Sequence, residues 1–240
     1  MFSTLKKALF HLRYTPFHPQ WFVFRHEAFY RQQIAQTATG KVLDIGCADQ
    51  TIKTYLSAET EYIGLDYYQT ATQWYGTKPH IYGDAQALPF ADNSMDTVLL
   101  LDVMEHLPRP HACLQDIARV LKPKGKLILQ VPFLYPIHDA PLDFQRWTQY
   151  GLQTAVKSLF TIRQQYHSGN PLETAGLLLN IAMTKIVVNG LANKHPATLF
   201  GIFVPPTILL VNLLCWVIDH FTEADDMMPY GYYWVLEKKD

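Results

Sequence analysis

The stretch Lys41-Val42-Leu43-Asp44-Ile45-Gly46-Cys47-Ala48-Asp49 decides the expected fold. Its apolar run, Val42 to Ile45, is typical of a central parallel strand, which is covered on both faces and therefore need not alternate. Gly46 follows, and because glycine lacks a Cβ atom it allows a tight turn and a close approach to a ligand. A helix that starts after such a turn presents free N–H groups at the carboxyl edge of the sheet, where ligands bind in doubly wound folds. The stretch therefore predicts a ligand site at this turn.

The composition indicates a folded chain with a large core. The chain has 240 residues, of which 49% are hydrophobic, and this length suits one large domain or a domain with an insertion. The net charge of −1 gives no reason to expect nucleic acid as a partner. The cysteines Cys47, Cys113 and Cys215 form no CxxC pair, which argues against a disulfide framework or a zinc site. We therefore expect a reducing, cytoplasmic location and assign no metal ligand.

Residues 1–37 form an N-terminal segment that is rich in aromatic and basic side chains. We expect it to cap the domain, to act as a lid over the ligand site, or to touch a membrane surface. Its last part, 27–37, has a helical pattern that Gly40 is placed to end. No secretory signal is expected, because His11 and Arg13 interrupt the apolar residues near the N-terminus.

Strand and helix patterns alternate through residues 38–132. The expected strands are 41–45, 61–66, 80–84, 95–102 and 126–132, and the expected helices are 51–57 and 112–122. This alternation predicts an α/β fold, a doubly wound and mostly parallel sheet with helices on both faces. The strand 95–102 is the most apolar and should lie at the centre. The second strand ends in Asp66, an acid in the position that can accept hydrogen bonds from ribose hydroxyls.

Five motifs in this order resemble the class I S-adenosylmethionine-dependent methyltransferases, in particular their type 11 branch. The motifs are residues 42–47, 64–66, 83–90, 102–107 and 118–127, and the resemblance covers roughly residues 38–165. It implies a Rossmann-like sheet of seven strands with the last strand antiparallel, and S-adenosyl-L-methionine as cofactor. In the C-terminal third we accordingly expect a helix at 150–157, a sixth strand at 160–166 and the seventh at 231–238. The methyltransferase domain would then be 38–240.

The resemblance also implies which residues bind the cofactor. Carried over by position, they are Asp44, Gly46, Cys47, Ala48, Asp66, Asp84, Ala85, Leu101 and Asp102. The turn would pass under the methionine part, Asp66 would hold the ribose, and Asp84 with the Ala85 amide would meet the adenine. Leu101 and Asp102 would lie beside the sulfonium. The family usually has glycine where this chain has Ala48 and Gln50, and a side chain at a turn position with positive φ costs about 1 kcal/mol.

The loop 132–148 is expected above the methyl group of the cofactor in this fold. His138 or Asp143 can take a proton from a hydroxyl or amine acceptor, because an ordinary histidine titrates near working pH, and His106 is a second candidate. Alternatively, Asp143 and Arg146 form a structural ion pair, His138 caps the loop, and catalysis rests on positioning without a general base.

An apolar insertion, residues 168–228, is expected before the last strand. Asn170-Pro171-Leu172-Glu173 predicts a helix start, with the helix running to Asn189 and ending at Gly190. Residues 196–218 carry no charge, but Pro205 and Pro206 divide them and leave a helix from Thr207. A helical cap, a dimer face, a hairpin on a membrane surface and a membrane span all remain open.

The leading hypothesis is a methyltransferase that acts on a small-molecule or lipid-linked acceptor. The alternative is a catalytically silent, methyltransferase-like interaction module, which Ala48 supports. A nicotinamide-dependent oxidoreductase is disfavoured, because the chain lacks the full GxGxxG pattern.

Overall fold

The computed structural model describes residues 10–223 and 225–240 and divides the chain into two compact units. The sheet unit consists of residues 29–133, 137–166 and 231–240, and the insertion unit of residues up to Ala28 with 134–136 and 167–230. The first nine residues, with part of the expected capping segment, lie outside the described residues.

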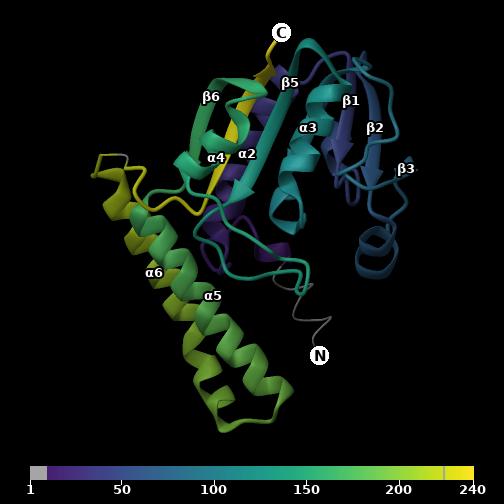
Figure 1. Cartoon of the computed structure of the whole chain (residues 1–240). Coiled ribbons are helices and arrows are strands. Elements are labelled where there is room, and N and C mark those ends of the chain that lie inside the picture. The colour runs from purple at the N-terminus through teal and green to yellow at the C-terminus, as the bar shows by residue number, and fades with distance from the viewer. Residues whose placement is uncertain (1–9, 224) are drawn as a thin grey trace. The chain divides into compact units, whose positions relative to one another are not determined.

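The sheet unit is built on a seven-stranded sheet with the order β3-β2-β1-β4-β5-β7-β6 (Figure 1). The strands are β1 (Lys41–Ile45), β2 (Glu61–Asp66), β3 (Ile81–Tyr82), β4 (Met95–Leu101), β5 (Leu121–Pro132), β6 (Phe160–Ser168) and β7 (Gly231–Lys238). Strands β1 to β5 pair in parallel, whereas β7 runs antiparallel to β5 with Trp234 opposite Leu129. The predicted sheet, the central place of β4 and the antiparallel last strand are confirmed.

Both faces of the sheet are covered, as the continuous apolar strands predict. Successive residues of a strand point to opposite faces, so Leu99 and Leu100 of β4 belong to different core clusters. On one face Tyr30 and Ile34 of α2 (Trp21–Thr37) pack in the Leu99 cluster. On the other face lie α3 (Pro110–Val120) and α4 (Gln149–Val156), whose buried side chains pack in the Leu100 cluster.

The segment after the first turn differs from the predicted helix 51–57. The chain forms only the short 3₁₀-helix η1 (Thr51–Tyr55), and none of its residues is buried. Short helices gain most of their stability from packing an apolar face. Since this segment has no such face, the tight turn at Gln50 leads into a single 3₁₀ turn. Two further short elements lie near the same edge, the π-helix η2 (Thr70–Tyr75) and the 3₁₀-helix η3 (Met104–His106).

The insertion unit contains two long apolar helices that run side by side (Figure 1). They are α5 (Pro171–Ala192) and α6 (Val204–His220), and the 3₁₀-helix η4 (Pro196–Phe203) precedes α6. The predicted end of α5 at Gly190 is wrong, because the helix continues to Ala192. The predicted helix start at Thr207, after a break at Pro205 and Pro206, is also wrong. Helix α6 begins at Val204 and holds both prolines in its first turn, which tolerates residues without an N–H group.

The N-terminal segment packs against these helices inside the insertion unit. Phe22 is fully buried in a cluster with Leu177 of α5. The amide of Asn180 donates a hydrogen bond of 2.8 Å to Asn212, and Asn212 in turn donates to the Pro16 carbonyl at 2.7 Å. These buried polar contacts fix the pairing of α5 with α6 and tie residues near Pro16 to both.

Candidate active site

The turn after β1 has the backbone conformation that the sequence leads one to expect. Gly46 has a φ of 73°, and its N–H donates to the Leu65 carbonyl of β2 at 2.8 Å. Ala48 and Gln50, which stand where glycine was expected, have φ values of 43° and 59°. Both positions are therefore left-handed, and the chain accommodates side chains there at a cost of roughly 1–2 kcal/mol per residue.

Replacing Ala48 by glycine should stabilise the protein by up to about 1 kcal/mol, since it removes this conformational cost. For a chain of this size that is a rise of roughly 2–4 °C in melting temperature. Thermal unfolding followed by circular dichroism measures it. Ala112→Gly, within α3, is the matched control and should lose about 1 kcal/mol. Equal losses in the two variants would contradict the left-handed conformation of Ala48.

Three carboxylates lie at this edge of the sheet, near the ends of β1, β2 and β3. Asp66 accepts hydrogen bonds from the Ala48 N–H at 2.9 Å and from the Tyr67 N–H at 2.7 Å. Asp44 accepts from the Tyr62 hydroxyl at 2.6 Å. Asp84 follows β3 and accepts from the Gln86 N–H at 2.8 Å. The edge is thus rich in acceptors and suits a ligand with a positive charge and several hydroxyl or amino donors.

Burial changes the chemistry of two groups beneath the turn. Burial raises the pKa of Asp44 to about 7, and the charges of Asp66 and Asp49 add to the rise, whereas the Tyr62 hydrogen bond opposes it. Burial likewise raises the pKa of the Cys47 thiol to about 12, with Asp44 and Asp66 contributing. Cys47 therefore lines the turn as a neutral thiol and is unsuited to act as a nucleophile.

The raised pKa of Asp44 predicts a pH-dependent affinity for a cationic ligand. Since the folded protein holds this proton up to about pH 7, against 3.8 normally, Asp44 lowers stability progressively between about pH 4 and pH 7. A cation favours the ionised carboxylate, so the affinity for S-adenosylmethionine should rise from pH 6 to pH 8 and then level off. Calorimetric titration in two buffers of different ionisation enthalpy counts the released proton. In Asp44→Asn the release should vanish, and its persistence would assign the proton elsewhere.

The end of β4 forms the other side of the edge. Asp102 has a φ of 52°, and its N–H donates to the Gln130 carbonyl of β5 at 3.0 Å. The Gln130 amide donates to the Asp102 carboxylate at 2.7 Å. Desolvation of this carboxyl group and the nearby charge of Glu105 raise the pKa of Asp102. Leu101 is the last residue of β4 and lies half-buried beside it.

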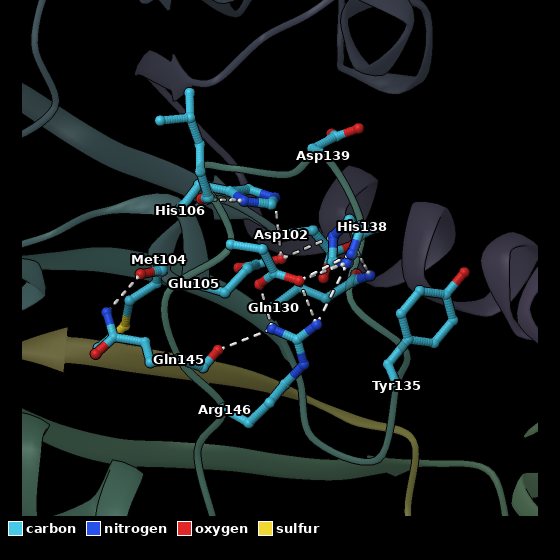
Figure 2. Close-up of polar contacts among 12 residues, drawn as sticks. Asp102, Met104, Glu105, His106, Gln130, Tyr135, His138, Asp139, Gln145 and Arg146 are labelled. Carbon is cyan, nitrogen blue, oxygen red and sulfur yellow. Dashed lines mark hydrogen bonds and ion pairs between the residues drawn. The ribbon is translucent and has the colours of Figure 1, made fainter.

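The two predicted histidines meet above this edge (Figure 2). The rings of His106 and His138 have centroids 4.9 Å apart and stand nearly perpendicular. Both Nε2 atoms lie 3.7 Å from Oε1 of Glu105, whose side chain is fully buried. Glu105 escaped the sequence interpretation, because glutamate is almost never fully buried unless it is paired. Its only signal was its place directly before His106.

Asp143 and Arg146 form the ion pair that was one of the two interpretations of this loop. Arg146 donates to Asp143 through both terminal nitrogens, and the His138 N–H donates to Asp143 at 2.9 Å. The Arg146 hydrogen bond and the His138 N–H hold the pKa of Asp143 at about 2. A carboxylate this acidic is a poor general base, so the arrangement favours a positioning role for Asp143 beside His138.

Tyr75 connects the cofactor side of the edge with the histidine side. Its hydroxyl donates to Asp139 at 2.6 Å. Burial, this hydrogen bond and the charges of Asp139, Asp66 and Glu105 together raise the pKa of Tyr75.

The comparison with protein families bears on this edge. Residues 43–129 match a family model described as a methyltransferase domain. This part of the chain is therefore similar to the S-adenosylmethionine-dependent methyltransferases. The matched residues run from β1 to β5 and include the turn, Asp66, Asp84 and the Glu105–His106 pair.

The methyltransferase domain is similar to curated enzymes over part of their length. It is 32% identical to cycloartenol-C-24-methyltransferase 1 of Oryza sativa, over 41% of this chain and 32% of that protein. It is 36% identical to demethylmenaquinone methyltransferase of Paenarthrobacter aurescens, over 34% of this chain and 30% of that protein. A probable S-adenosylmethionine-dependent methyltransferase of Mycolicibacterium smegmatis is 30% identical over 51% of each chain. The chain thus spans between 30% and 51% of the length of these relatives.

Solved structures agree with the fold. The PH0226 protein of Pyrococcus horikoshii matches with a TM-score of 0.52 and 19% identity, over 95% of this chain and 96% of that one. The [4+2]-cyclase SpnF matches with a TM-score of 0.53 and 17% identity, over 90% of this chain and 80% of that one. Because one of these neighbours is a cyclase, the fold does not by itself determine the reaction.

Proposed function

We propose that the protein transfers a methyl group from S-adenosyl-L-methionine to a lipid or lipid-linked acceptor. Binding of the cofactor, the first part of this proposal, rests on the acceptor-rich edge. There the left-handed turn at Gly46 lies beside the carboxylates of Asp44 and Asp66. Ribose hydroxyls suit Asp66, the adenine amino group suits Asp84, and the buried Asp44 suits a cationic neighbour. The nearest alternative is an interaction module of the same fold that binds no cofactor.

The chain contributes orientation and proton handling to this reaction. When bound, S-adenosylmethionine supplies a methyl group on a sulfonium, and an in-line nucleophile can take that methyl group while the sulfur keeps the bonding electron pair. His106 and His138 stand beside Asp102 at the end of β4, where they can hold the proton that the acceptor loses. Asp143 positions His138 through the bond to its N–H.

A hydrophobic acceptor is supported by the insertion unit and by the relatives. The segments Pro171–Ala192 and Gly201–His220 are long and apolar enough to cross a membrane, by length and composition. Their large side chains remain exposed, including Leu179 at 50%, Ile186 at 59% and Leu210 at 57%. Apolar surface of this extent is uncommon on proteins that meet only water. Among the relatives, two are named for methylation of cycloartenol and of demethylmenaquinone.

The first test separates the enzyme from the silent module. S-adenosylmethionine at about 100 times its dissociation constant should stabilise the protein by roughly 2.7 kcal/mol, a rise of roughly 5–11 °C in melting temperature. Incubation with methyl-labelled cofactor and a membrane lipid extract should then place label in the organic phase. No thermal shift with the cofactor or its demethylated product would favour the silent module, and label only in the aqueous phase would overturn the lipid acceptor.

We further propose that α5 and α6 hold the protein at the cytoplasmic face of a membrane. In flotation experiments the wild type should rise with uncharged phosphatidylcholine liposomes. The variant Leu210→Asp/Leu214→Asp should not, since each buried charge costs roughly 2.5–3.5 kcal/mol in a bilayer. Tyr150→Asp on α4, where the tyrosine is already 76% exposed, is the control and should float normally. A wild type that stays with the soluble fraction would exclude the membrane role.

A further inference from the structure

Three potential metal ligands converge at the ends of β4 and β5 (Figure 2). They are Glu105 and His106 in η3 and His138 in the loop after β5. One ligand atom from each residue lies within 4.8 Å of the others. The cluster thus brings two imidazoles and one carboxylate to one point beside Asp102.

The burial of the Glu105 carboxylate is the first reason to expect a metal ion here. Its side chain is completely buried, and neither carboxylate oxygen accepts a hydrogen bond from the residues that the structure describes. Burying a carboxylate is very costly unless the charge is paired, hydrogen-bonded or coordinated to a metal. Nε2 of His106 and Nε2 of His138 each lie 3.7 Å from Oε1, beyond hydrogen-bond distance.

The surroundings of the Nδ1 atoms of the two histidines are the second reason. Nδ1 of His106 lies 2.9 Å from the Leu142 carbonyl, and because a carbonyl only accepts, this nitrogen holds the proton. The lone pair of neutral His106 is then on Nε2, directed toward a carboxylate oxygen. Nδ1 of His138 lies 3.4 Å from the Asp143 carboxylate and also 3.4 Å from Nη2 of Arg146. Metal-binding histidines commonly have such a carbonyl or carboxylate behind them, which fixes the ring and its tautomer.

We propose that Glu105, His106 and His138 bind a divalent first-row metal ion, with Zn²⁺ the best match. Two histidines and one glutamate form one of the ligand sets of catalytic zinc, which leaves a fourth position for water or substrate. Ligands about 2.0–2.1 Å from a tetrahedral ion are roughly 3.4 Å apart, so the two 3.7 Å separations need only small side-chain rotations. The three ligand atoms lie within 4.8 Å of one another, so the two histidines must also move toward each other when an ion binds.

On the proposed function, this ion gives the acceptor its orientation, and with the ion bound the two histidines act as ligands in place of holding the acceptor's proton. An acceptor hydroxyl bound at the open position loses its proton to solvent more readily, because the ion stabilises the oxyanion. The oxyanion then forms the new bond to the methyl carbon, and the carbon–sulfur bond breaks with its electrons on sulfur. The inference thus specifies an oxygen acceptor and assigns Asp143, through His138, a positioning role.

The test is Co²⁺ binding by the full-length, chelator-stripped protein, because Co²⁺ reports its ligands by visible absorption. One equivalent should give the intense bands of a four- or five-coordinate site, and Zn²⁺ should displace it. Glu105→Gln, which keeps the shape of the side chain, should weaken the binding at least about tenfold, and so should His138→Ala. His111→Ala on α3, outside the cluster, is the matched control and should bind as the wild type does.

The outcomes separate this inference from the proposed function when the thermal shift with S-adenosylmethionine is measured on the same samples. A retained cofactor shift without Co²⁺ bands overturns the metal site alone, and so do bands that survive both substitutions unchanged. Bands without a cofactor shift support the metal site and contradict the methyltransferase. If Glu105→Gln fails to fold, His138→Ala decides the question, since its side chain is 30% exposed and lies in a loop.

Discussion

Replacing Gly46 by alanine should destabilise the protein by roughly 2–5 kcal/mol and abolish its stabilisation by S-adenosylmethionine. Gly46 has a φ of 73°, where a side chain costs about 1–2 kcal/mol. A Cβ atom there would also lie 2.3 Å from Cγ2 of Val103. The backbone fixes the position of a Cβ atom, so Val103 or the backbone itself would have to move. Overpacking of this kind costs typically 1–3 kcal/mol more. On the proposed function, both effects act at the residue that brings the turn under the cofactor.

Urea unfolding of the variant measures the loss, and Gly76→Ala is its matched control. Gly76 has a φ of 64°, but nothing lies within 4 Å of an added Cβ atom. It should therefore show only the conformational cost of about 1–2 kcal/mol. In the double variant Gly46→Ala/Val103→Ala the clash should be relieved in part. If Gly46→Ala were no more destabilised than Gly76→Ala, the close contact with Val103 would be ruled out.

The cofactor edge could be predicted because each of its parts has a local signal. An apolar run followed by an acid ends β1 and β2, and the stretch that became β7 has aromatic and β-branched residues within the same bounds as predicted. The strand signals depend on neighbours in the sequence, which a single chain displays directly. The left-handed positions of Ala48 and Gln50 were expected for another reason, because the family that the motifs resemble usually has glycine there.

The histidine cluster and the division into units could not be predicted in the same way. Glu105 is buried only because η3 and the loop after β5 come together, and sequence alone gives no measure of that approach. The N-terminal segment contacts α6 across a sequence separation of 196 residues, through Asn212 and the Pro16 carbonyl. The expected helix at 51–57 failed for a related reason, since none of the residues of η1 is buried against the rest of the unit. Tertiary context decided all three.

Replacing Asp66 by alanine should weaken the binding of S-adenosylmethionine at least about a hundredfold. On the proposed function its carboxylate accepts two hydrogen bonds from the ribose, and bonds to a charged group contribute roughly 1.5–3 kcal/mol each. Asp66 also accepts the Ala48 N–H at 2.9 Å and the Thr70 hydroxyl at 3.1 Å. Its loss therefore removes both a ligand contact and the acceptor that holds the turn.

Calorimetric titration with the cofactor, together with the thermal shift, measures this effect. Asp66→Asn separates the two contributions, because an amide oxygen can still accept from Ala48 but has no charge for the ribose. Glu61→Ala, at the other end of β2, removes an exposed carboxylate paired with Lys41 and is the control for charge alone. It should bind normally. A dissociation constant for Asp66→Ala within threefold of the wild type would remove Asp66 from the site. The left-handed turn and Asp44 would then bind any ligand there without a ribose contact.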